Sequence, residues 1–195
     1  VLMNHLFFRC SSLTDLDVSG FDTSNVTTMK SLFNNCKKLK FVDVANWDTS
    51  NVTDTSYFLN NCVVMETLDV SGWDTSKVTI TEAMFQYCRL LEKITGIENF
   101  KTGNVETMGW MFYDCKSLKS LDLSGWDTSK VTAMNSMFSS NITNAGDMAL
   151  SYLNISTGDT GNGTKMNHMF NGCAQLKELD LSKWDMSKVR TTSHM

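Results

Sequence analysis

A phrase of about 26 residues recurs along this chain and limits the folds that it can adopt. In three copies an opening Trp is followed by Asp-Thr-Ser, by Asn or Lys, and then by Val-Thr. The aromatic residues that open the copies are Phe21, Trp47, Trp73, Phe100, Trp126 and Trp184. Repetition with a period of about 20–50 residues is typical of solenoids, in which each repeat buries its apolar face against its neighbours. We therefore expect the function to reside on a repeated surface.

Near the end of each copy apolar and polar residues alternate, as in Leu68-Asp69-Val70. Equivalent segments are Leu16-Asp17-Val18, Val42-Asp43-Val44, Leu121-Asp122-Leu123 and Leu179-Asp180-Leu181. A period of two residues indicates a β-strand that is buried on one side. Copies one period apart should then pair in register as a parallel sheet, with the aspartates on its exposed face.

The middle of each copy has a different apolar spacing. Val105, Met108, Met111-Phe112 and Cys115 follow one another at intervals of about three or four residues. This spacing predicts a short helix with one buried face. The Asp-Thr-Ser group just before it would supply the N-cap. The pattern therefore predicts an α/β fold with one short parallel strand and one short helix per coil, in about seven coils.

Two interruptions divide an otherwise single repeat domain, residues 1–195. One extra residue in Ile94-Thr95-Gly96-Ile97 predicts a β-bulge. The second, residues 139–163, is an irregular repeat with added residues, in which Gly158–Gly163 replaces the aromatic phrase. It is either a decayed repeat or a binding loop, because insertions in repeat arrays map to one face. The pattern starts and ends in mid-repeat, so we expect the chain to be a fragment of a longer one.

Composition excludes several classes of function. The net charge of -4 argues against a nucleic-acid-binding surface. No apolar run of 18 residues is present, so we expect no membrane insertion by this fragment. Proline is absent, which suits a stack of coils because proline has no backbone N–H to donate between them. No catalytic set of residues stands apart from the repeat, so we expect a non-enzyme without cofactors.

Three polar columns, meaning residues at the same place in successive copies, invite other interpretations. The cysteines are Cys10, Cys36, Cys62, Cys88, Cys115 and Cys173. They are too far apart for a zinc site and are expected to be buried free thiols. The turn aspartates are Asp22, Asp48, Asp74, Asp127, Asp159 and Asp185. They either form a calcium-binding ladder or cap the following segment, and their place at a turn favours capping. A threonine ladder could bind ice, but Met186 and Lys101 interrupt it; its members are Thr23, Thr49, Thr75, Thr102 and Thr128.

With its columns aligned, the phrase resembles the 26-residue repeat of bacterial surface proteins. The resemblance rests on Leu-x-x-Leu-Asp-Leu-Ser-Gly-Trp-Asp-Thr-Ser-Lys-Val-Thr, which begins at Leu118 and continues to Met137-Phe138. This family is similar to the BspA-type leucine-rich repeats of mycoplasma surface lipoproteins and of cell-wall proteins of lactic-acid bacteria and Listeria. The resemblance implies a leucine-rich-repeat-like solenoid outside the cell, with adhesion or partner binding as its role. It carries no catalytic residues.

We therefore expect a cell-surface interaction module that presents the exposed face of the strands to a protein or glycan on another cell or matrix. The candidate binding residues are Asp17, Asp43, Asp69, Asp122, Asn154 and Asp180, with Phe41 and Tyr152 beside them. Because the aspartates make this face acidic, a basic protein or a sugar fits it better than nucleic acid. The alternative function is a structural stalk that displays another domain, which predicts no partner for this fragment.

Overall fold

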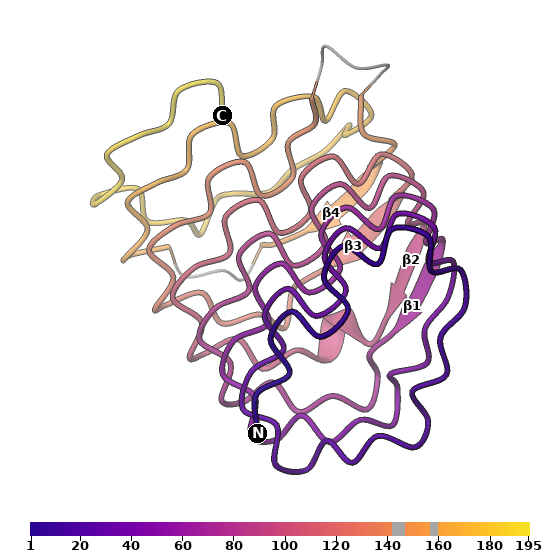
Figure 1. Ribbon diagram of the computed structural model, residues 1–195. Coiled ribbons are helices and arrows are strands. Elements are labelled where there is room, and N and C mark those ends of the chain that lie inside the picture. Colours follow the sequence, from indigo (N-terminus) through magenta and orange to yellow (C-terminus); the bar gives the residue numbers. More distant parts are fainter. Residues whose placement is uncertain (142–146, 157–159) are drawn as a thin grey trace.

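The strands of this protein are short, parallel and paired across the repeat. The computed structural model describes residues 1–141, 147–156 and 160–195. Its strands are β1 (Thr67–Asp69), β2 (Lys93–Thr95), β3 (Ser120–Asp122) and β4 (Tyr152–Asn154). They form two parallel pairs, β1 with β2 and β3 with β4 (Figure 1). Asp69 lies opposite Thr95, and Asp122 lies opposite Asn154. The predicted parallel pairing in register is confirmed for these copies.

Other predicted strand segments keep their pattern of burial without becoming strands. Val42 and Val44 are buried while Asp43 is exposed, yet residues 42–44 have no strand assignment, and neither do residues 16–18 and 179–181. A hydrogen bond from the N–H of Lys40 to the carbonyl of Thr14 (3.3 Å) joins the first two copies just before these segments. The alternation thus predicted which side chains face inward, but it did not predict where a hydrogen-bonded ladder forms.

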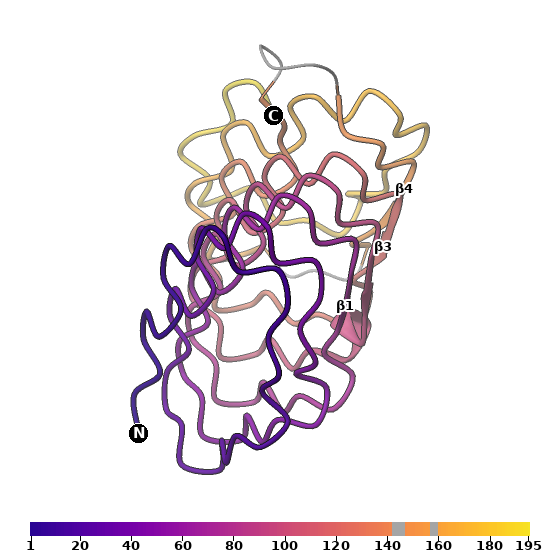
Figure 2. The same cartoon turned by 45° about the vertical axis from the view of Figure 1, so that its right-hand side comes forward.

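A second parallel contact runs through the repeats at a place where no strand was expected. Single bridges link Leu2, Thr28, Asp54, Ile80, Thr107, Ala133, Lys165 and Thr191 in that order. Each of these residues holds the same place in its copy, and each bridge joins neighbouring copies. Equivalent segments of successive repeats therefore lie side by side, as the stacked loops of Figure 2 show.

The helix predicted for the middle of each repeat is wrong. The only helix in the described residues is the three-residue 3-10 helix η1 (Ile97–Asn99). The predicted helical stretch is a chain of turns, in which Phe33 donates to Phe58 of the next copy at 2.9 Å and Leu32 donates back to Met29 at 3.1 Å. Left-handed residues such as Ser31 (φ 55°) recur there, and they interrupt any right-handed helix.

The extra residue near position 96 is absorbed by a turn rather than by the predicted β-bulge. Gly96 adopts a φ of 88°, and η1 follows it directly. Asn99 donates its N–H to the Gly96 carbonyl at 3.1 Å, which closes this turn. β2 pairs with β1 but not with β3, so the sheet is divided after β2, beside the turn.

Apolar side chains from every copy fill the space between the two parallel contacts. Phe33, Phe58, Phe85, Phe112 and Phe138 are fully buried. The opening aromatic rings stack between copies: Phe100 lies 6.4 Å from Trp73 and 6.3 Å from Trp126, with nearly parallel planes. The protein is thus a repeated domain with few short parallel strands, almost no helix and an extensive buried aromatic cluster.

The irregular repeat interrupts this arrangement only locally. Residues 142–146 and 157–159 lie outside the described residues. Before the first of these gaps, Phe138 and Ser140 donate their N–H groups to Met169 and Asn171 of the following copy, each at 2.9 Å. After it, Met148 and Leu150 are buried. The contact between neighbouring repeats therefore resumes on both sides of the insertion.

Candidate functional site

The residues predicted to bind a partner share one side of the molecule, which we call the strand face. It consists of the outward residues of β1 to β4 and of the equivalent positions 15, 17, 41, 43, 178 and 180. All the candidate aspartates are exposed, and Asn154 is partly exposed. Phe41 is 59% exposed and Tyr152 is 51% exposed, which is unusual for aromatic side chains of this size. The structure therefore brings the predicted residues to one exposed side.

Each of the five candidate aspartates of the strand face also closes a local turn, a role that was not predicted. The Oδ1 atom of Asp69 accepts the N–H of Ser71 at 2.9 Å, and Asp122 accepts that of Ser124 at 3.0 Å. The same bond, to the residue two places on, forms at Asp17, Asp43 and Asp180. Hydrogen bonds from Ser71 lower the pKa of the Asp69 carboxyl, so it is charged at neutral pH. These carboxylates therefore stabilise the turn as well as giving the face its charge.

Two shallow depressions mark the strand face where neighbouring strands do not pair. One lies between β2 and β3 and is lined by Lys93, Ile97 and Asp122 among others. The other lies between β4 and the last copy and is lined by Tyr152, Asn154 and Asp180 among others. The repeat period did not predict these depressions. They arise because β2 does not pair with β3 and β4 does not pair with the last copy.

The turn aspartates behave as the capping interpretation predicts. Asp48 accepts the N–H of Ser50 at 3.0 Å and Asp127 accepts that of Ser129 at 2.9 Å, so each caps a turn instead of a helix. The same bond forms at Asp22, Asp74 and Asp185, whereas Asp159 lies outside the described residues. Hydrogen bonds from Ser50 lower the pKa of Asp48. In the described part of the chain, no three acidic, His or Cys side chains gather as a metal site would require.

The threonine ladder cannot act as an exposed ice-binding surface, because its members are buried. Thr49 is 2% exposed and Thr102 is 3% exposed. Their hydroxyls donate to the next copy: Thr49 to the carbonyl of Asp74 at 3.0 Å, and Thr102 to that of Asp127 at 2.9 Å. Sequence position alone did not reveal that these side chains point inward to tie repeats together.

The cysteine column is buried in the middle of the array but not at its first member. Cys36, Cys62, Cys88 and Cys115 are buried, whereas Cys173 is partly exposed and Cys10 is exposed. Each buried thiol lies against a carbonyl of the preceding copy, as Cys88 does against Leu59 at 3.1 Å. Cys10 has no preceding copy in this sequence, so the expectation that all six thiols are buried is wrong for this residue.

This difference predicts graded thiol reactivity. Burial raises the pKa of Cys36 to about 11 and that of Cys88 to about 12, so the reactive thiolate is scarce at neutral pH. In the folded protein a thiol reagent should modify Cys10 quickly, Cys173 slowly, and the other four only on unfolding. Mass spectrometry of time points, without reductant, measures the order. Fast labelling of Cys88 in the native state would contradict the burial of the column.

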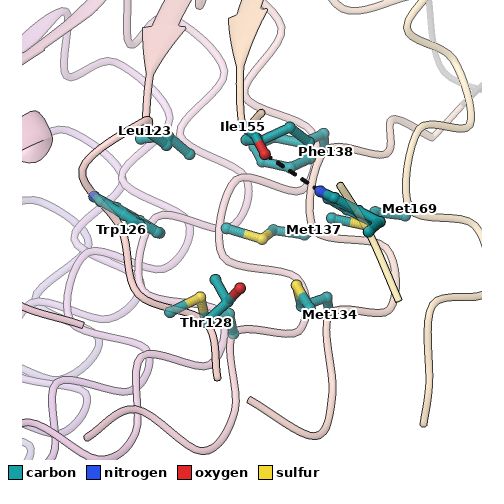
Figure 3. A pocket seen from close by; sticks show the side chains of 10 residues that line it. Leu123, Trp126, Thr128, Met134, Met137, Phe138, Ile155 and Met169 are labelled. Atoms are coloured by element: carbon teal, nitrogen blue, oxygen red, sulfur yellow. Dashed lines mark hydrogen bonds between the residues drawn. The ribbon is translucent and has the colours of Figure 1, made fainter. Parts of the chain in front are cut away.

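A small cavity lies where the aromatic column is interrupted, and Trp126 and Met137 are among the residues that line it (Figure 3), as is Trp184. The sequence has no aromatic residue at the intervening place. The indole N–H of Trp184 donates to the carbonyl of Ile155 at 3.2 Å beside it. Met134 also lines the cavity, whose volume is about 20 Å³. That is room for about one water molecule, so the cavity is a packing defect and not a ligand site.

One further groove was missed by the sequence analysis because its residues come from different copies. It is lined by the aromatic side chains of Tyr87, Trp110 and Tyr113. Ser140 and His168, which come from later copies, also line it. The available signal was that Trp110 and His168 occupy a column that holds Ser31 and Ala83 elsewhere. A column that does not require an apolar residue is free to vary with function.

Comparison with known proteins identifies a family but no activity. No helix in the described residues is long and apolar enough to cross a membrane. No curated protein matches the sequence. One family matches it three times, over residues 1–96, 64–152 and 145–195, so the matches together span the chain. The chain therefore belongs to the DUF285 family, which is described as a Mycoplasma protein of unknown function.

Proposed function

We propose that this chain is part of a leucine-rich-repeat-like solenoid on the outside of a bacterial cell, where its strand face binds a macromolecular partner without catalysis. The bridges that join the same place in successive copies support the solenoid. The resemblance of the repeat to that of BspA-type surface proteins is the support for a surface location.

The observation that carries this proposal is the fixed register of exposed side chains along the strand face. Pairing of β3 with β4 puts Ser120 beside Tyr152 and Asp122 beside Asn154. Parallel strands lie about 4.8 Å apart, so within each strand pair the exposed side chains stand in register at a fixed spacing. A rigid row of this kind suits a large partner, because little conformational entropy is lost when it binds.

The charge of the strand face favours a basic protein as the partner. Asp17, Asp69 and Asp180 are exposed, and hydrogen bonds from neighbouring serines lower the pKa of each. They are therefore ionised at neutral pH. Lys93 is the cation within the paired strands, where it stands opposite Thr67. Exposed charges of one sign speed the encounter with an oppositely charged partner and make that encounter sensitive to salt.

The triple variant D43N/D69N/D122N tests this proposal. Asparagine can still close the turn through its side-chain oxygen, so the variant removes charge while keeping the local fold. We expect binding to animal-cell extracellular matrix coated on a biosensor to weaken about tenfold or more at low salt, and by less at high salt. The melting temperature should change little.

The control is T49S, which changes a buried residue that is not part of the strand face and should leave binding unchanged. Equal binding by the triple variant and the unmodified protein would exclude the strand-face charges as the interaction site.

A stalk or spacer remains the second candidate function. It is favoured by the turn-closing bonds of the strand-face aspartates, which give these residues a structural reason to recur. If the fragment binds no matrix, cell or protein surface in the same assay, the spacer function is supported and the binding proposal fails.

A further inference from the structure

An open groove of about 360 Å³ lies among the turns of four copies and shares no lining residue with the depressions of the strand face. Its volume falls at the small end of the range of ligand sites in proteins, about 300–1,000 Å³. Trp110, which lines it, is 37% exposed although it is a large aromatic residue. The groove therefore offers a partly exposed tryptophan to solvent.

The aromatic wall of the groove is held in place by its neighbours. Tyr87 and Tyr113 meet edge to face, with 5.4 Å between ring centres. The Arg89 guanidinium lies 5.7 Å from the centre of the Tyr87 ring, and it also donates to Asp114 at 2.9 Å. Because the Asp114 side chain is fully buried, this ion pair fixes Arg89 and with it the tyrosine. A wall ordered in this way loses little entropy when it binds a ligand.

The polar lining of the groove is rich in hydroxyls and amides. The Ser140 hydroxyl is buried, with only 3% of the residue exposed, and it has no hydrogen-bond partner among the described residues. A buried hydroxyl without a partner costs free energy that a ligand can recover. The amide oxygen of Gln86 accepts from Asn60 at 2.6 Å, which leaves its nitrogen as a donor. The described lining contains no Asp, Glu, Lys or Arg.

We propose that this groove binds a neutral oligosaccharide of hexose or N-acetylhexosamine units. The C–H face of a pyranose ring carries partial positive charge and packs against the negative face of an indole or phenol ring. Sugar hydroxyls both donate and accept, as the hydroxyls and amides of this lining do. A phosphate or other anion is bound best by Lys or Arg, and the described lining contains neither. The site is independent of the strand face, so it gives the protein a second mode of attachment.

The test uses the whole chain on an array of neutral oligosaccharides that end in galactose, N-acetyllactosamine or N-acetylglucosamine, together with their sialylated counterparts. Hits are titrated in solution by isothermal titration calorimetry, which does not depend on Trp110 as the reporter. We expect W110A to weaken binding at least about tenfold, because an exposed tryptophan is often the dominant contact of its site. S140A should weaken binding severalfold while leaving the melting temperature unchanged or higher, since it removes an unpaired buried hydroxyl.

The matched control is Y152A, which removes an exposed aromatic side chain from the strand face and should leave saccharide binding unchanged. The proposal is overturned if no neutral saccharide binds, if only sialylated ones do, or if W110A binds like the unmodified protein. D43N/D69N/D122N should keep saccharide binding, so failure of the groove and failure of the strand face give different results.

Discussion

Replacing Trp73 with alanine is expected to lower the free energy of unfolding by about 3–5 kcal/mol, the usual cost of emptying a large aromatic site in a core. Trp73 is 7% exposed. Its ring stacks on Phe100 at 6.4 Å and meets Phe58 edge to face at 5.2 Å, while its indole N–H donates to the carbonyl of Val44 at 2.9 Å. The substitution leaves a cavity and removes a hydrogen bond between adjacent copies, although the Val44 carbonyl still accepts the N–H of Trp47 at 3.2 Å.

The matched control for W73A is F41A, which also truncates an aromatic side chain but on the strand face. Phe41 is 59% exposed, so its loss should change stability by less than about 0.5 kcal/mol. Urea unfolding followed by circular dichroism measures both variants. Similar losses in the two variants would show that the inside and the outside of the repeat are reversed.

Replacing Gly96 with alanine is expected to destabilise the fold by about 3 kcal/mol, through strain and crowding together. The φ of 88° at Gly96 is one that residues with a Cβ rarely adopt. A Cβ there would also collide with the backbone of Ser71, 2.5 Å from its nitrogen and close to its Cα. Backbone cannot move aside as a flexible side chain can, so neighbouring copies would have to separate.

Gly20 provides the control, since a Cβ added there meets nothing within 4 Å and its φ is ordinary. G20A should be neutral or stabilising by up to about 1 kcal/mol, because it restricts the unfolded chain. If G96A is as stable as G20A in the same urea titration, the turn that accommodates the extra residue is not built as described.

Burial could be predicted from the sequence where a column has a single physical requirement. Leu68 and Val70 were placed on the buried side of their strand and are buried, and Asp69 and Asp122 were placed outside and are exposed. A stack of identical copies repeats the same environment, so one copy's burial pattern predicts that of its neighbours. This is why periodicity gave the core and the strand face.

The helix was wrongly predicted because spacing cannot separate a helix from stacked turns. Val105, Met108, Met111 and Cys115 are all buried, as the spacing requires, but their neighbour Trp110 has a φ of 57°. Nothing in a tryptophan favours this left-handed conformation. It is imposed by bonds to the next copy, such as that from the Trp110 N–H to the Asn135 carbonyl at 3.0 Å.

The candidate sites show the same limit. Exposure of Phe41 and Tyr152 followed from their place in the strand segment. The groove could not be predicted in this way. It is lined by Tyr87, Trp110 and Ser140, which come from different copies and are not part of the shared phrase. Contacts between different copies depend on how the copies are aligned and on insertions in single copies. The phrase that the copies share contains neither kind of information.

The most direct test of the central claim, that the repeats stack in a single row, is a set of electron spin distances along the strand face. Spin labels are attached at position 17 and at either position 122 or position 180 in a Cys10→Ser, Cys173→Ser background, in which the native thiols that remain are the four buried ones. Position 180 lies two copies beyond position 122, and each repeat adds about 4.8 Å. Labels at positions 17 and 180 should therefore be about 10 Å farther apart than labels at positions 17 and 122. An equal or shorter distance for positions 17 and 180 would contradict a row of stacked repeats.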